Sequence, residues 1–129
     1  MNVPPTLDPL LAHARADADV VAVMLFGSAA RGEAARDLDV AVVLRPDVAA
    51  TFEKSIEYAA WSSGRRHEGI DASVFQELPL YVRERVLSDG RALLVNDADA
   101  LCEIAFATLR EWATFRPKLD EYLEGAANG

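Results

Sequence analysis

The sequence predicts an α/β protein in which a β-sheet is covered by helices. The chain has 129 residues, the length of one ordinary domain, and its 51% hydrophobic and 26% charged residues are typical of globular proteins rather than disordered chains. Short apolar runs rich in β-branched residues alternate with stretches whose apolar residues recur at the helical period. We therefore expect a single domain over residues 1–124 and a disordered tail over residues 125–129.

The first third of the chain predicts a helix followed by two strands. Thr6 is a candidate N-cap for a helix that ends between residues 16 and 19, with an apolar face of Leu7, Leu10, Leu11 and Ala14. Residues 20–26 are continuously apolar, which favours a central strand covered on both faces. After this strand, residues 28–35 predict a short helix weakened by Gly32, and residues 38–44 predict the second strand.

The middle of the chain predicts a helix, a strand and another helix. Residues 49–62 follow the helical period with an apolar set of Phe52, Ile56, Ala59 and Ala60. Residues 69–75 read as the third strand. Pro79 is suited to the first turn of the next helix, where its missing N–H does no harm, and Gly90 ends that helix.

The last part of the chain predicts a short edge strand over residues 91–95 and one long helix. Asp97 or Asp99 is expected to cap this helix, and its apolar positions recur every three or four residues: Leu101, Ile104, Ala105, Thr108, Leu109, Trp112 and Phe115. We expect Trp112, Phe115 and Tyr122 to belong to the core, and the alternative is that this amphipathic helix provides a docking surface. Pro117 is expected to end or kink the helix because it removes a backbone hydrogen bond.

The composition excludes several classes of protein. The formal net charge is −8, and because sequence-independent binding to DNA or RNA needs a basic surface, we expect no direct nucleic-acid binding. The longest apolar run, residues 20–26, is too short to cross a bilayer, and the N-terminus has no basic segment followed by an apolar one. We therefore expect a cytoplasmic protein with no membrane association. The single Cys102 is expected to be a small buried residue.

Three aspartates form the main candidate site. Asp37 and Asp39 are two residues apart at the start of a predicted strand, so their side chains point to the same face of the sheet. Asp71 lies in the third predicted strand, and if the two strands are neighbours the three carboxylates meet at one end of the sheet. Such a cluster repels itself when empty, and Mg²⁺ is the cation that prefers carboxylate oxygens. The alternative is that Asp37 and Asp39 are ordinary residues at a strand entrance.

A glycine-serine turn supplies the second half of the candidate site. Gly27 lets a phosphate approach the backbone closely, and exposed N–H groups after it form an anion site to which the Ser28 hydroxyl and Arg31 could add donors. Arg31 is equally compatible with a solvated surface charge. Phosphate donors opposite a carboxylate cluster describe a site for a nucleoside triphosphate. His13 and His67 are expected to be surface residues rather than metal ligands, and the basic residues around His67 form a solvated loop.

These residues resemble a known family. Gly27-Ser28, the Ala-Arg-Gly at residues 30–32, Asp37-Leu38-Asp39 and the later Asp71 resemble the signature of the DNA polymerase β-like nucleotidyltransferases. Residues 70–100 and 111–123 look like the minimal nucleotidyltransferases (MNT), small antitoxins encoded beside HEPN-domain toxins. The resemblance implies a polymerase β-like palm fold, with a mixed β-sheet flanked by helices.

The resemblance also implies a reaction and a partner. In such an enzyme Asp37 and Asp39 would bind two Mg²⁺ ions, and Asp71 would bind the one that activates the attacking hydroxyl. Gly27 and Ser28 would hold the β- and γ-phosphates of the substrate ATP. The acceptor would be a tyrosine of a HEPN ribonuclease toxin, which adenylylation silences, so a hetero-oligomer with this toxin is expected.

Two alternatives remain open from the sequence. A small-molecule nucleotidyltransferase of the aminoglycoside-modifying type would share the motif, although such enzymes usually carry an additional substrate-binding domain. A catalytically inactive antitoxin that neutralises its toxin by binding alone would differ only in its chemistry, and the presence of all three aspartates disfavours it.

Overall fold

The computed structural model describes residues 3–32, 37–48, 51–63 and 69–128. A 3₁₀ turn, η1, precedes the first helix and another, η3, follows the third strand. In chain order the elements are η1 (Pro5–Leu7), α1 (Asp8–Ala16), β1 (Val20–Phe26), β2 (Leu38–Leu44), α2 (Thr51–Ser63), β3 (Ile70–Val74), η3 (Phe75–Glu77), α3 (Leu80–Asp89), β4 (Arg91–Val95) and α4 (Ala98–Asn128).

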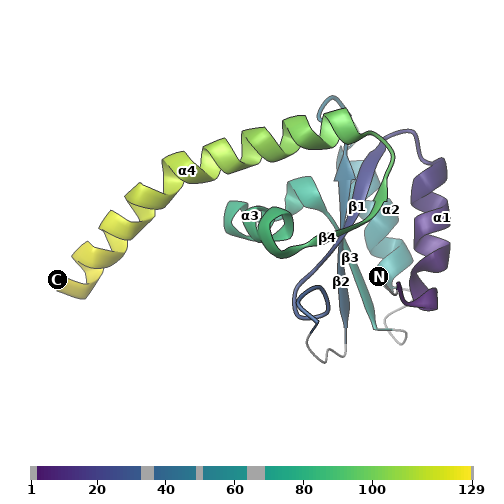
Figure 1. Ribbon diagram of the computed structural model, residues 1–129, viewed down its shortest axis with the longest axis horizontal. Coiled ribbons are helices and arrows are strands. Elements are labelled where there is room, and N and C mark those ends of the chain that lie inside the picture. The colour runs from purple at the N-terminus through teal and green to yellow at the C-terminus, as the bar shows by residue number, and fades with distance from the viewer. Residues whose placement is uncertain (1–2, 33–36, 49–50, 64–68, 129) are drawn as a thin grey trace.

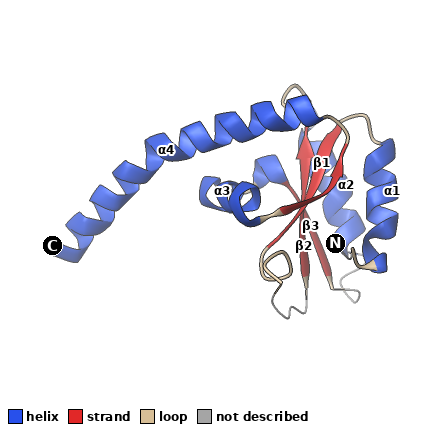
Figure 2. Cartoon of the chain, viewed as in Figure 1, coloured by secondary structure: helices blue, strands red, loops and turns tan. Residues whose placement is uncertain are grey.

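The four strands form one mixed sheet in the order β3-β2-β1-β4 (Figure 2). β1 pairs antiparallel with β2 and β4, whereas β2 and β3 are parallel. A parallel pair needs a long crossover connection, and α2 lies in the connection between β2 and β3. The sheet with its flanking helices confirms the mixed α/β fold, and β4 is an edge strand as predicted.

Helices cover both faces of the sheet (Figure 1). α1 and α2 lie on one side, where the buried cluster includes Leu10, Val40 and Tyr58. α3 and the first part of α4 lie on the other side, with Val86 and Ile104 packed against the opposite strand face. Every residue of β1 except Phe26 is buried, which explains why its sequence is continuously apolar rather than alternating.

Two local predictions near the N-terminus are wrong. Thr6 lies inside η1, and Leu7 occupies the N-cap position of α1 without a side-chain hydrogen bond. The expected apolar face is nevertheless buried. Residues 28–32 form turns rather than the beginning of a helix. The reason is Gly32, whose φ of +78° lies outside the helical region; the remainder of that predicted helix, residues 33–36, is outside the described residues.

α2 buries a different face from the one predicted. Phe52 and Ile56, which we expected in the core, are 73% and 54% exposed. The buried side chains are Tyr58 and Ser62, and Lys54 is partly buried beside them. Each of these side chains has a polar group that forms hydrogen bonds and apolar atoms that pack in the interior. A prediction from hydrophobicity alone therefore chose the wrong side of the helix.

α4 is longer than predicted. Asp97 caps it through a 3.1 Å hydrogen bond from the Ala100 N–H, and the helix continues through Pro117 to Asn128, including residues 125–128 where we expected disorder. Figure 1 shows the helix leaving the sheet in a long gentle curve. Among the described residues, none of the helices combines the length and hydrophobicity that crossing a bilayer requires.

Two predictions about burial in α4 are wrong. Phe115 and Tyr122 are 42% and 72% exposed instead of buried in the core, because the helix has passed the edge of the sheet that would cover them. Cys102 is also exposed. It lies one residue after Leu101 and two before Ile104, which pack against the sheet, so its side chain points to the other side of the helix.

Candidate functional site

The predicted acidic residues lie at the ends of two neighbouring strands. Asp39 in β2 and Asp71 in β3 are direct partners in the parallel register, so their side chains leave the same face of the sheet. Asp37 immediately precedes β2, and a 2.6 Å hydrogen bond from the Leu38 N–H to the Gly69 carbonyl joins the beginnings of the two strands. The fold therefore brings together aspartates that are 32 to 34 positions apart in the sequence.

Burial and the charges of the other two aspartates affect Asp39. The pKa of Asp39 is raised above its ordinary value, first by burial and then by the negative charges of Asp71 and Asp37. Asp39 is partly buried, whereas the other two are exposed. These carboxylates offer the oxygen atoms that Mg²⁺ prefers. Within the described residues, however, the three do not place one carboxylate oxygen each within 4.8 Å of one another.

The turn after β1 contacts this acidic group directly. Phe26 pairs with Asp39 in the antiparallel register, and Gly27 follows with a φ of +75°. A Cβ atom at residue 27 would lie 2.6 Å from Oδ2 of Asp39. A side chain at residue 27 would therefore displace the Asp39 carboxylate from its present position, and it would also have to adopt a backbone conformation that favours glycine.

The other predicted phosphate-binding residues follow in the same turn. Ser28 is partly buried and Arg31 is exposed. The Arg31 N–H donates to the Gly27 carbonyl over 3.3 Å, which closes the turn around Ser28. The predicted basic cluster with His67 lies outside the described residues.

A pocket of about 380 Å³ opens beside the acidic residues, lined by Asp37, Ser62, Ile70 and Asp71. Its buried serine was not among the residues selected from the sequence. Ser62 sits in the run Trp61-Ser62-Ser63, next to the glycine that signals the end of the helix, so the pattern indicated helix termination and nothing more.

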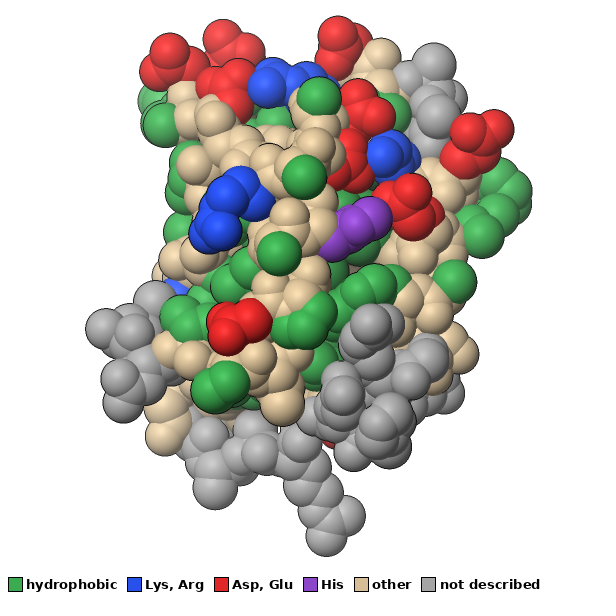
Figure 3. All heavy atoms as spheres, turned by 90° about the vertical axis from the view of Figure 1, so that its right-hand side faces the viewer, with side chains coloured by type: hydrophobic (Ala, Val, Ile, Leu, Met, Phe, Trp, Pro, Cys, Tyr) green, Lys and Arg blue, Asp and Glu red, His purple; other side chains and the backbone are tan. Residues whose placement is uncertain are grey.

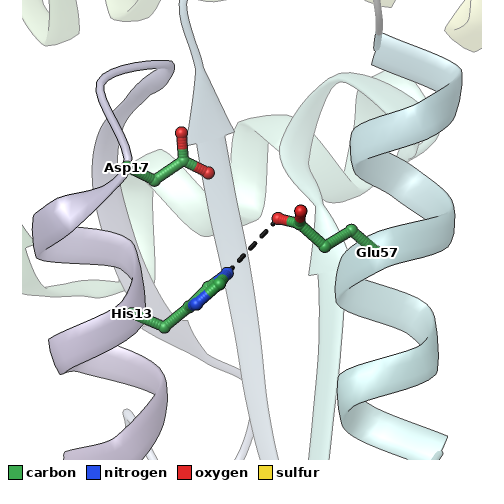
Figure 4. Close-up of side chains that lie close together, drawn as sticks. All are labelled: His13, Asp17 and Glu57. Atoms are coloured by element: carbon green, nitrogen blue, oxygen red, sulfur yellow. Dashed lines mark hydrogen bonds and ion pairs between the residues drawn. The ribbon is translucent and has the colours of Figure 1, made fainter.

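A second polar cluster lies between α1 and α2. Ligand atoms of His13, Asp17 and Glu57 lie within 4.8 Å of one another, the one such group within the described ranges (Figure 4). The Nε2 atom of His13 is 3.3 Å from the Glu57 carboxylate. However, Nζ of Lys54 is 2.7 Å from Oδ2 of Asp17 and 3.7 Å from Glu57, so an ammonium group already neutralises these acids. We interpret this cluster as a structural ion-pair network.

The pKa values of this cluster agree with a structural role. Burial pushes the pKa of Asp17 upward, but hydrogen bonds from Lys54, the Asp19 N–H and Tyr58 outweigh it and hold the pKa below 3.8. The hydrogen bond with Asp17 raises the pKa of Lys54.

On the face of the molecule over α1, acidic, basic and hydrophobic side chains are interspersed (Figure 3).

Comparison with known proteins defines the class of this protein. The family model for polymerase beta nucleotidyltransferases matches residues 10–99, which include β1 to β4 and both acidic stretches. The chain belongs to this nucleotidyltransferase family, as its motif predicts. No curated protein matches the chain.

Solved structures with the same fold come from toxin–antitoxin systems. A chain of a structure described as a toxin–antitoxin with AMP-PNP is 17% identical, with a TM-score of 0.67 over 97% of this chain and 99% of that one. A chain from the tri-AMPylated HEPN toxin of Shewanella oneidensis in complex with MNT antitoxin is 17% identical, with a TM-score of 0.61 over 95% and 93%. A chain of the toxin–antitoxin MntA-HepT is 16% identical, with a TM-score of 0.61 over 95% and 94%.

Proposed function

We propose that this protein is an antitoxin that transfers AMP from ATP to a tyrosine of a HEPN ribonuclease toxin. The observation that carries the proposal is the in-register pairing of Asp39 with Asp71, beside Asp37 and against the Gly27 turn. Membership of the nucleotidyltransferase family supports the reaction class. The solved toxin–antitoxin structures with AMP-PNP and with an AMPylated HEPN toxin support the nucleotide and the partner.

Each residue of the site receives a role from its position. Asp37 and Asp39 would hold two Mg²⁺ ions together, and Asp71 would complete the ligand set on the acceptor side. When bound, Mg²⁺ neutralises the phosphate charge and lowers the pKa of the attacking hydroxyl. Gly27, Ser28 and Arg31 offer backbone and side-chain donors to the β- and γ-phosphates, which fixes the leaving group in line with the attack.

The reaction balances with the groups present. The acceptor oxygen forms a bond to the α-phosphorus of ATP, and the bond from that phosphorus to the bridging oxygen breaks, releasing pyrophosphate. The acceptor's proton passes to Asp71, whose exposed carboxylate lines the pocket where the hydroxyl would enter. The partly buried Asp39 would remain a metal ligand during the reaction.

We propose the exposed side of α4 as the surface that binds the HEPN toxin. Among the described residues, five of the nine exposed large hydrophobic side chains lie on this helix: Phe106, Leu109, Phe115, Tyr122 and Leu123. Phe106 and Leu109 line an apolar groove of about 480 Å³ with Cys102, Ala105 and Arg110. Exposed apolar side chains on a projecting helix are typical of a protein-binding surface rather than of a small-molecule site.

The test is transfer of labelled AMP to the HEPN protein encoded beside this chain. With Mg²⁺ and ATP, the wild-type protein should label that partner. The double variant Asp37→Asn/Asp39→Asn should lose at least 10³-fold of the rate, since both metal bridges are removed. It should remain folded with an unchanged or higher melting temperature, because the repulsion that raises the Asp39 pKa is relieved.

A double variant with the same change of charge away from the site, Asp89→Asn/Asp99→Asn, provides the control and should label the partner at the wild-type rate. A partner that is bound and inhibited without being labelled would support an antitoxin that acts by contact alone. Labelling of an aminoglycoside in place of the partner would support a small-molecule nucleotidyltransferase.

A further inference from the structure

The Ser62 hydroxyl makes two buried hydrogen bonds on either side of Asp71. It donates to the Ile70 carbonyl over 3.1 Å and accepts from the Ala72 N–H over 3.0 Å. Ser62 itself is 6% exposed. One side chain at the end of α2 therefore holds the residues immediately before and after the third aspartate.

The position of β3 in the sheet makes these bonds necessary. β3 is an edge strand with β2 as its one neighbour in the sheet. Backbone groups of successive residues point to opposite edges of a strand, so the Ile70 carbonyl and the Ala72 N–H share one edge and the backbone of Asp71 faces the other. Ser62 occupies the place that a further strand would otherwise fill.

Loss of this hydroxyl would leave two buried backbone groups without partners. Ile70 and Ala72 are 2% and 5% exposed, so water reaches them poorly in the present conformation. An unpaired buried N–H or carbonyl is strongly unfavourable, and the edge of β3 would shift toward solvent to relieve it. Because Asp71 lies between the two groups, its carboxylate would move with the strand.

We infer that Ser62 is a positioning residue for Asp71 in nucleotidyl transfer. The inference rests on the proposed function, and it goes beyond it by assigning a role to a residue outside the nucleotidyltransferase motif. Ser62 also lines the pocket that Asp71 and Asp37 share. The hydroxyl thus fixes the third metal-binding carboxylate relative to the first two without itself contacting substrate.

The test compares variants of Ser62 with a matched variant on the same helix. Ser62→Ala removes the hydroxyl, Ser62→Cys fills its space with a weaker hydrogen-bonding group, and Ser62→Thr retains it. Tyr58→Phe is the control, because it removes another partly buried hydroxyl of α2, which bonds Asp17 over 3.1 Å far from the acidic group. All four proteins are compared with wild type as full-length chains.

Two measurements follow the position of Asp71 without relying on catalysis. Electron paramagnetic resonance should find Mn²⁺ binding, with AMP-PNP present, about tenfold weaker in Ser62→Ala, weakened in Ser62→Cys and near the wild-type value in Ser62→Thr. Hydrogen exchange at the Ala72 amide should accelerate at least tenfold in Ser62→Ala. Tyr58→Phe should change neither quantity.

The outcomes separate the inference from the proposed function. Wild-type Mn²⁺ affinity in a folded Ser62→Ala or Ser62→Cys protein would overturn the positioning role. An equal loss of affinity in Tyr58→Phe would also overturn it, because the effect would then come from destabilised α2 in general. If the wild-type chain binds no Mn²⁺ with AMP-PNP, the proposed function fails, and the inference fails with it.

Discussion

At the scale of single residues, the contact between Gly27 and Asp39 is the most constrained feature of the site. The glycine needs its positive φ to turn the chain out of β1, and the missing side chain leaves space for the carboxylate. Gly32 has a similar φ of +78° but no atom within 4 Å of the position that a Cβ would take. Substitutions at the two glycines therefore distinguish the effect of backbone strain from the effect of a steric collision.

We predict that Gly27→Ala slows AMP transfer by at least 10²-fold, because the new methyl group displaces the Asp39 carboxylate. Gly32→Ala should carry the backbone strain alone, about 1 kcal/mol of lost stability, and keep transfer within about threefold of wild type. Steady-state transfer rates and urea unfolding of both variants measure the two effects. Equal rates in the two variants would show that the collision has no role.

The sequence was sufficient to select the candidate residues of this site but not the contacts that support them. Asp37, Asp39 and Asp71 could be predicted because strand periodicity and motif spacing are local properties of the chain. Their approach depended on β2 and β3 being neighbours, which the sequence left as a condition and the parallel register of the two strands satisfies. Ser62 could not be predicted, because its partners are backbone groups that every residue carries.

At the scale of elements, the ion-pair network between α1 and α2 fixes how the two helices pack on the sheet. Lys54 and Tyr58 of α2 both reach Asp17 at the end of α1, over 2.7 and 3.1 Å. This network explains why α2 buries Tyr58 and exposes Phe52. Periodicity alone could not reveal that a lysine and a tyrosine would be buried in preference to two apolar residues, because the choice depends on an aspartate at the end of another helix.

We predict a specific pH dependence for this network. The pKa of Asp17 is lowered in the folded state, so its stabilising effect is complete above its ordinary value of 3.8 and is lost as the pH falls through the lowered folded value. Asp17→Asn should therefore reduce the free energy of unfolding by about 2 kcal/mol near neutral pH, with the difference disappearing in strong acid. Urea unfolding of both proteins across this range measures it.

An Asp17→Asn protein that stayed less stable than wild type by the same amount in strong acid would contradict this interpretation. Glu57→Gln serves as the control, because its carboxylate is more exposed and lies 3.7 Å from Lys54. Such an exposed pair should contribute less than 1 kcal/mol.

At the scale of the whole molecule, the chain consists of a sheet domain and a helix that projects from it. The first turns of α4 pack on the sheet through Ile104 and Thr108, which are 8% and 4% exposed. Beyond them the same apolar period continues, but Phe115 and Tyr122 are 42% and 72% exposed. Its sequence therefore predicted a helix correctly and core burial wrongly, because a period identifies an apolar face and does not identify what lies against it.

We predict that the exposed aromatic side chains of α4 contribute to binding of the proposed HEPN partner. Phe106→Ala and Tyr122→Ala should each weaken the complex by about tenfold or more, as expected for large aromatic side chains at an interface. Phe52→Ala is the matched control, since Phe52 is 73% exposed on α2 and Phe106 is 71% exposed on α4. Calorimetric titration with the partner measures the affinities. A similar loss for Phe52→Ala would place the contact elsewhere.

The order of these parts along the chain has an evolutionary consequence. Gly27, Asp37, Asp39 and Asp71 all precede η3, whereas the projecting half of α4 begins more than forty residues after the last of them. Under the proposed function, substitutions beyond Phe115 would alter the partner-binding helix without touching the acidic residues. Recognition and nucleotidyl transfer could then change independently of each other.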